Sequence, residues 1–113
     1  MQGLTDENKK ALTIFLGECW HEEEAIPNLP HLTWCKKCHY IGFTYLDFTD
    51  WRVVGRLVSK VSGDTWVSVY GPPSHHPQDI SCTIGDEDNH ITEYGNSLQE
   101  AIIAAVLAYL EDV

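Results

Sequence analysis

Apolar residues recur at helical spacing near both ends of the chain, and each of these stretches predicts a helix. The first helix is expected over residues 5–16, with Thr5 as the capping residue. The last helix is expected after Ser97, which is placed to form a capping box with Glu100. Its apolar positions are Leu98, Ala101, Ile102, Ala105, Val106 and Tyr109.

A third helical pattern lies in the middle of the chain. It is expected to begin at Asp47, because Asp47 and Asp50 lie three residues apart like the two ends of a capping box. The apolar positions that follow predict one buried face, formed by Trp51, Val54, Leu57, Val58 and Val61.

Between the middle helix and the last helix, β-branched and alternating residues predict three strands, at residues 65–70, 80–84 and 90–94. Residues 71–77 include three prolines, which cannot donate to a sheet, and they are expected to form a loop. Cys82 lies on the apolar side of its strand. It is therefore expected to be a small core residue and not a nucleophile.

The order of these elements predicts an α+β fold. It consists of a helix, an aperiodic segment at residues 18–45, a second helix, a three-stranded antiparallel sheet and a C-terminal helix. The chain has 113 residues, of which 43% are hydrophobic. This length and composition predict a single domain over residues 1–113, near the size at which an additional cross-link helps stability.

The aperiodic segment contains four residues with the spacing of zinc ligands: Cys19, His21, Cys35 and Cys38. They form a Cys-x-His pair and a Cys-x-x-Cys pair, separated by thirteen residues. Two such pairs can hold one Zn²⁺ ion tetrahedrally. Because all four positions would be filled by protein, we expect a structural zinc site, and residues 18–45 are interpreted as a zinc-knuckle segment.

The identity of the histidine ligand is left open by the sequence. His31 lies between the two pairs and His39 follows Cys38 directly, so either could replace His21. A redox-active dithiol is disfavoured because no strand precedes Cys35 in the predicted pattern and no helix clearly begins there.

The charge of the chain restricts its partners. Seventeen acidic and seven basic residues give a net charge of −10. Such a surface repels phosphate backbones, so direct nucleic-acid binding is not expected, and a basic partner protein is favoured. The same charge could equally serve only to keep the protein soluble.

No recognised catalytic motif is present, and the chain is not expected to be an enzyme. It has no Gly-rich phosphate loop, nucleophile elbow or His-Glu-x-x-His helix. His75 and His76, in the proline-rich loop, are candidates for binding a metal or a substrate, although such a pair is more often simply solvated. Asp86, Glu87 and Asp88 lack the spacing of a calcium loop and are expected to form a hairpin turn.

Three aromatic residues in the zinc-knuckle segment are candidates for docking a partner: Trp20, Trp34 and Tyr40. The alternative is that they cover the metal site and join the core. No apolar run approaches the length of a membrane span, and the first residues lack the pattern of a signal peptide. A cytoplasmic protein with reduced thiols is therefore expected.

Four short sequences together resemble small proteins encoded by bacteriophages and prophages. They are LGECWH at residues 16–21, WCKKC at 34–38, DFTDW at 47–51 and GNSLQEAI at 95–102. The chain is similar in particular to the phage ABA sandwich domain family. This resemblance implies layers of helix, sheet and helix, a phage origin, and no established reaction.

The leading hypothesis for function is an anti-defence inhibitor, for instance an anti-CRISPR protein. It would bind a host effector protein by placing an acidic, nucleic-acid-mimicking surface in a basic groove. One alternative is a protein that sequesters a small molecule or nucleotide signal, with Tyr70 or Trp66 and the histidine loop as its pocket. Another is a metal-dependent hydrolase. Self-association through an apolar strand edge is also compatible with the sequence.

Overall fold

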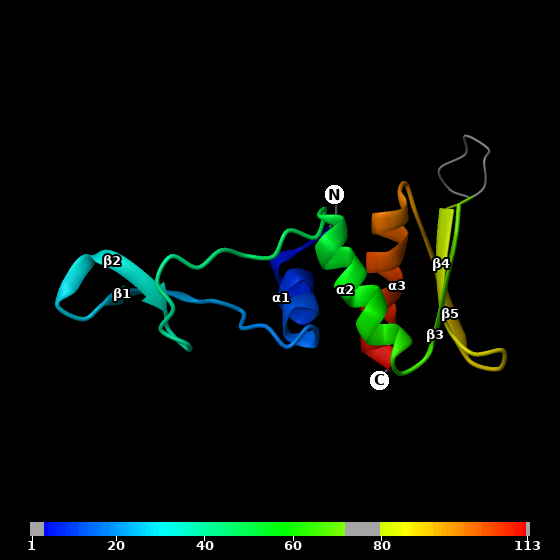
Figure 1. Ribbon diagram of the computed structural model, residues 1–113, viewed down its shortest axis with the longest axis horizontal. Coiled ribbons are helices and arrows are strands. Elements are labelled where there is room, and N and C mark those ends of the chain that lie inside the picture. Colours follow the sequence, from blue (N-terminus) through cyan, green and yellow to red (C-terminus); the bar gives the residue numbers. More distant parts are fainter. Residues whose placement is uncertain (1–3, 72–79, 113) are drawn as a thin grey trace.

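The computed structural model describes residues 4–71 and 80–112, and within these residues the chain has an α+β fold (Figure 1). Its helices are α1 (Asp6–Phe15), α2 (Trp51–Ser62) and α3 (Leu98–Asp112). A two-stranded sheet consists of β1 (Glu23–Ile26) and β2 (Leu29–Cys35). A three-stranded sheet consists of β3 (Trp66–Tyr70), β4 (Ile80–Gly85) and β5 (His90–Gly95). The predicted fold class and the C-terminal helix are confirmed.

The three-stranded sheet is antiparallel throughout, with the order β3-β4-β5. Cys82 and Ile84 of β4 point toward the helices and belong to the same core as residues of α1, α2 and α3. All three helices therefore lie on one face of this sheet, and Figure 1 shows the sheet as the outermost layer. The resemblance implied helices on both faces, whereas here the second face carries no described helix.

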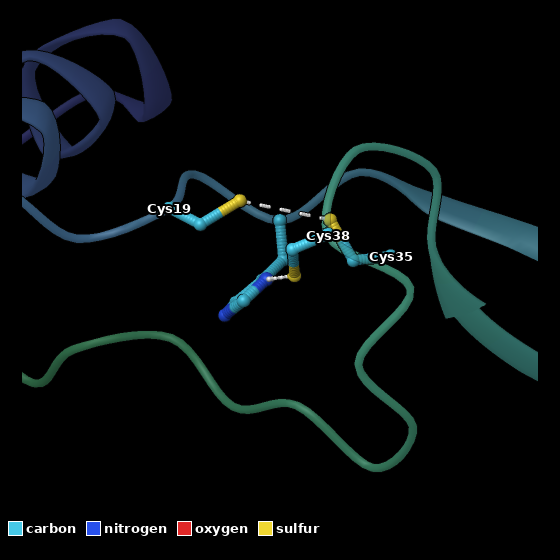
Figure 2. A group of neighbouring side chains, drawn as sticks. Cys19, Cys35 and Cys38 are labelled. Atoms are coloured by element: carbon cyan, nitrogen blue, oxygen red, sulfur yellow. Dashed lines mark hydrogen bonds between the residues drawn. The ribbon is translucent and has the colours of Figure 1, made fainter.

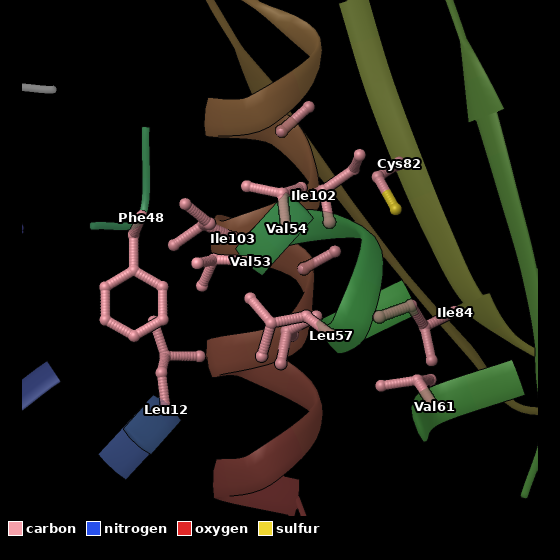
Figure 3. Packing of buried hydrophobic residues seen from close by; sticks show 13 residues of the cluster. Leu12, Phe48, Val53, Val54, Leu57, Val61, Cys82, Ile84, Ile102 and Ile103 are labelled. Carbon is pink, nitrogen blue, oxygen red and sulfur yellow. The ribbon is translucent and has the colours of Figure 1, made fainter. Parts of the chain in front are cut away.

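The core forms where α2 and α3 pack against each other and the sheet (Figure 3). α3 lies between α2 and the sheet, which explains why it is apolar on most of its sides. Leu12 of α1, Leu57 of α2 and Ile84 of β4 are almost completely buried there. Cys82 is fully buried in the same cluster, as the sequence predicted.

Side-chain caps fix the N-terminal starts of α1 and α3 where they were expected. The Thr5 hydroxyl accepts a hydrogen bond from the Asn8 backbone N–H at 3.1 Å. The Ser97 hydroxyl accepts one from the Glu100 N–H at 3.2 Å. The Glu100 carboxylate in turn accepts one from the Asn96 N–H at 2.9 Å. The first two bonds satisfy N–H groups that a helix start leaves unpaired, and the third ties Glu100 back to the residue before the cap.

The prediction for the start of α2 was wrong by four residues. The helix begins at Trp51, and Asp50 is its cap, accepting a hydrogen bond from the Arg52 N–H at 2.9 Å. Asp47 instead accepts hydrogen bonds from the backbone and hydroxyl of Thr49, at 2.9 and 2.6 Å. The Asp50 carboxylate is engaged by the backbone and side chain of Arg52 and not by Asp47, so the predicted capping box does not form and residues 47–50 make a turn.

The buried face of α2 is also rotated from the predicted one. Val53 is buried together with Val54, Leu57 and Val61, whereas Trp51 is 52% exposed. At 100° per residue, Trp51 lies roughly 100° from the centre of this stripe, which places its ring at the rim of the core.

Residues 18–45 are more ordered than the sequence suggested, because they contain the β1–β2 hairpin. The strands pair Glu23 with Cys35 and Ala25 with Thr33, and the register shifts after Ala25. The turn passes through Asn28, whose φ of 69° is in the left-handed region that asparagine tolerates. Strands this rich in exposed residues lack the alternation that identifies a half-buried strand in a sequence.

Residues 18–45, termed the arm below, project away from the helices and the three-stranded sheet, which we term the body (Figure 1). The molecule measures 57 × 30 × 20 Å along its principal axes. The hydrophobic core contains no arm residue, and within the arm only Ile26 and Cys35 are buried. The arm thus has almost no hydrophobic core of its own.

His75 and His76 lie outside the described residues. No helix in the described part of the chain has the length and apolar character needed to cross a membrane.

Candidate metal centre

The four predicted metal ligands come together at the base of the arm (Figure 2). Cys19 and His21 precede β1, Cys35 ends β2, and Cys38 lies in the turn that follows. Pairing of the two strands brings the ends of the hairpin side by side, so residues more than a dozen positions apart become neighbours. The four ligand atoms all lie within 4.8 Å of one another. This Cys₃His cluster could hold one metal ion.

The cysteines of the cluster are free thiols, not a disulfide. Cys19 Sγ lies 3.8 Å from Cys35 Sγ, far beyond the S–S bond length of about 2.05 Å. Cys38 Sγ lies 3.4 Å from His21 Nδ1. The cluster therefore offers three sulfur atoms and one ring nitrogen, the ligand set of a soft or borderline metal ion.

Backbone hydrogen bonds shape the turn that carries Cys35 and Cys38. The Lys37 N–H donates to Cys35 Sγ at 3.4 Å, and the His39 N–H donates to the Cys35 carbonyl at 2.8 Å. The Cys35 N–H donates to the Tyr40 carbonyl at 3.0 Å. Donation to sulfur favours the thiolate, which is the form that binds metals.

His39 occupies the backbone position at which this turn closes. Its φ is 60°, in the left-handed region where residues with a Cβ are disfavoured. The His39 ring stacks on Trp34, with centroids 4.1 Å apart and planes 12° apart. This stacking stabilises the conformation and directs the His39 ring to Trp34, so His39 does not join the cluster.

Among the described histidines, His21 is therefore the one in the cluster. His31 is an exposed residue of β2 outside the group of four. The pairing of the strands sets His21, and neither His31 nor His39, beside the Cys-x-x-Cys turn.

The cysteines differ in acidity. Burial, together with hydrogen bonds to Cys35 and Cys38, raises the pKa of Cys19 to about 11. Burial also opposes ionisation of Cys35, but backbone N–H groups of Cys38, Glu22 and Lys37 and the His21 ring outweigh it and lower the Cys35 pKa to about 5. Cys35 is thus better prepared than Cys19 to be a thiolate, and a bound cation would favour ionisation of Cys19.

Aromatic rings surround the cluster, including two that sequence reasoning missed. The Phe43 ring stacks on His21 with centroids 4.7 Å apart, and the Tyr45 hydroxyl donates to the His21 carbonyl at 3.1 Å. Trp20 packs against Tyr45 with centroids 4.9 Å apart. Of the three aromatic residues considered as docking candidates, Trp20 and Trp34 pack against Tyr45 and His39. Tyr40 stacks loosely on His21, with centroids 6.4 Å apart, and is 62% exposed.

Two ion pairs brace the arm near the cluster. Lys37 Nζ lies 3.4 Å from the Glu22 carboxylate, which joins the two ligand pairs. Arg56 of α2 lies 2.8 Å from the Glu18 carboxylate, which joins the base of the arm to the body. Both pairs are partly exposed, so each contributes at most about 1 kcal/mol.

There is little room for a substrate beside the cluster. The cavity lined by Cys19, His21 and Tyr45 has a volume of about 40 Å³. Ligand pockets usually enclose about 300–1,000 Å³, so this cavity suits only a few water molecules.

Cys82 and the acidic segment at residues 86–88 have structural roles. Burial raises the pKa of Cys82 to about 11, which keeps it a neutral thiol in the core. The Asp86 carboxylate accepts hydrogen bonds from the N–H groups of Asp88 and Asn89, at 3.0 and 2.7 Å. The hairpin turn predicted for this acidic segment is confirmed.

No protein-family model, curated protein or solved structure matches this chain.

Proposed function

We propose that the Cys₃His cluster binds one Zn²⁺ ion that folds the arm, and that the protein is a binding protein and not an enzyme. Zn–S bonds of about 2.3 Å in a tetrahedron correspond to an S···S separation of about 3.8 Å. Cys19 and Cys35 have this separation, 3.8 Å. A tetrahedral Zn²⁺ also sets sulfur and imidazole nitrogen about 3.5 Å apart, and the Cys38–His21 distance is 3.4 Å.

The case for a structural role rests on the composition of the arm. Only Ile26 and Cys35 are buried in it, which is too little apolar burial to hold a hairpin in water. Metal binding supplies the missing free energy in small units of this kind. A site with four protein ligands has no open position for a substrate or an activated water, unlike a catalytic zinc site.

The partner that we propose is a host effector protein with a basic nucleic-acid-binding groove, as expected of an anti-defence inhibitor. The net charge of −10 supports this choice, because it favours encounter with a basic surface. The turn between β4 and β5 presents three exposed carboxylates, from Asp86, Glu87 and Asp88. The arm adds exposed apolar side chains that suit a protein partner: Leu29, Leu32, Tyr40 and Ile41.

Zinc stoichiometry and folding of the arm provide the first test. Native mass spectrometry of the wild-type protein should give 12.8 kDa plus one zinc ion. Cys19→Ser should lose the ion and the ordered arm, as read from NMR spectra, whereas Cys82→Ser should keep the ion. A wild-type protein that folds its arm equally well without metal would refute the structural role.

The partner is tested by recovering the zinc-loaded protein from a lysate that contains defence systems and then measuring affinity for the recovered effector. Binding through an acidic surface should weaken steeply as salt is raised. Affinity that does not depend on salt would contradict the mimicry of nucleic acid. Cleavage of a substrate by the zinc-loaded protein would contradict the assignment as a non-enzyme.

A further inference from the structure

The three-stranded sheet has a face that none of the described helices covers. Cys82 and Ile84 face the helices, so the alternate positions of the three strands form the opposite face, termed the outer face below. Its central row is Ser68, Thr83 and Thr92, one residue from each strand. Figure 1 shows α1, α2 and α3 all on the other side of the sheet.

Large aromatic side chains occupy three corners of the outer face. Tyr70 and Tyr94 flank Ser81 in one row, and Trp66 lies beside Gly85 at the other end. Each of the three is exposed over 60–62% of its surface. Tyrosine and tryptophan at such density are typical of the energetic centres of protein interfaces.

Between the aromatic corners the surface is uncharged. The Thr83 and Thr92 hydroxyls bond each other across the strands at 2.9 Å. None of the outward positions of β3, β4 or β5 is Lys, Arg, Asp or Glu. The chain as a whole has a net charge of −10. Because the outer face itself carries no carboxylate, another acidic molecule can dock there without bringing like charges into direct contact.

We propose that the outer face is a homodimer interface, in which two copies of the chain pack sheet against sheet. A single-stranded nucleic acid also stacks on aromatic sheets, but it requires cations that this face lacks. A second copy presents the same aromatic and hydroxyl groups and the same absence of charge. Packing of the two sheets about 10 Å apart would supply the layer that each body lacks.

The charges at the edge of the face select an orientation. The acidic turn of Asp86, Glu87 and Asp88 lies next to the row that contains Trp66. The two-fold axis would lie between the two sheets, in the plane of the interface and perpendicular to the strands. It sets the acidic turns of the two copies at opposite ends of the interface, which minimises their repulsion. This arrangement sets Tyr70 of one copy against Trp66 of the other, and Tyr94 against His90.

Sedimentation equilibrium of the zinc-loaded full chain tests the proposal. At concentrations up to about 100 μM, the weak end of specific association, the average mass should approach twice 12.8 kDa. Thr83→Glu should raise the dissociation constant at least tenfold, about 1.4 kcal/mol, because it buries a carboxylate from each copy in the interface. Thr33→Glu, in an exposed strand of the arm, is the matched control and should leave the dimer intact.

Tyr94→Glu provides a second variant that disturbs no side-chain bond across the sheet, and it should also give a monomer. Raising salt should strengthen the dimer, since it screens repulsion between two acidic chains, whereas it should weaken binding to a basic effector. The proposed dimer and the proposed binding to a basic effector can therefore be refuted independently of each other. A wild-type protein that stays monomeric under all these conditions would overturn the proposed dimer. So would a monomer that binds neutral oligosaccharides through the outer face. A dimer that survives both Glu substitutions would overturn the interface.

Discussion

At the scale of single residues, His39 shows how one side chain can hold an unfavourable backbone conformation. The residue after Cys38 must adopt a positive φ so that the chain can return toward Cys35. Glycine would do so without strain. His39 instead offsets the strain by stacking on Trp34, and aromatic stacking contributes about 0.5–1.5 kcal/mol.

His39→Val should therefore weaken zinc binding by about tenfold or more, because a β-branched residue is strained by at least 1–2 kcal/mol in this region and cannot stack. The measurement is competition for zinc with a chromophoric chelator. The control is His31→Val, at an exposed position of β2 where a β-branched residue suits a strand. Equal zinc affinities for the two variants would contradict the role assigned to His39.

At the scale of elements, two glycines give opposite expectations for the same substitution. A Cβ at Gly95, where β5 leads into α3, would lie 2.6 Å from the Ala101 N and 2.8 Å from the Glu100 Cβ. A Cβ at Gly55, inside α2, would meet nothing within 4 Å. The first glycine is required by close packing, and the second only lowers the stability of its helix.

Gly95→Ala should lower the free energy of unfolding by about 1–3 kcal/mol, and Gly55→Ala should raise it by about 0.5–1 kcal/mol. Urea denaturation followed by circular dichroism measures both. A Gly95→Ala variant as stable as the wild type would show that the contacts at the β5–α3 junction are not as close as described, and a destabilised Gly55→Ala variant would contradict the open space at that position.

The cap of α2 makes the stability of the body depend on pH. Hydrogen bonds from the Arg52 side chain and N–H lower the Asp50 pKa. Since the unfolded value is about 3.9, this carboxylate stabilises the fold above about pH 4, and the contribution is lost as pH falls through the folded-state pKa.

Asp50→Asn should keep a capping oxygen, so its stability at pH 7 should stay close to that of the wild type, with a flatter loss in acid. Asp50→Ala should lose about 1 kcal/mol at pH 7. Urea denaturation at a series of pH values separates the two effects. An Asn variant that follows the wild type at every pH would contradict the ionic contribution of Asp50.

Sequence reasoning succeeded for the elements that carry their own local signals. Ser97, Glu100 and a long apolar pattern identified α3, and Thr5 identified the start of α1. It missed the β1–β2 hairpin because strands exposed on both faces lack alternation. It also missed Phe43, because nothing local shows that this ring lies on His21.

For the candidate metal site, spacing alone named the four residues that the structure brings together, since ligand pairs from one tight turn are a local feature. It could not choose among the three histidines, since that choice depends on which residues the hairpin brings together. The start of α2 was misplaced because Asp47 and Asp50 were interpreted as the two ends of one capping box, whereas the Asp50 carboxylate bonds Arg52 and caps the helix itself.

At the scale of the whole molecule, the separation of arm and body predicts independent responses to metal removal. The core contains no arm residue, so a chelator should disorder residues 18–45 and leave the body folded. Backbone NMR should show loss of dispersed signals for the arm, with the signals of α2, α3 and β4 retained. Limited proteolysis should then cut within the arm. Unfolding of the body by chelation would mean that the metal stabilises both parts.

If the arm folds only around a bound ion, as proposed, recognition through the arm depends on the supply of metal. If the partner binds the ordered hairpin, bound zinc raises the affinity for the partner. Bound partner then raises the affinity for zinc by the same factor, because linkage between two ligands is reciprocal. A captured effector would then slow the escape of zinc. When zinc is scarce, the arm would lose its order and the protein its partner binding, while the helices and sheet of the body stayed folded and could bind zinc again later.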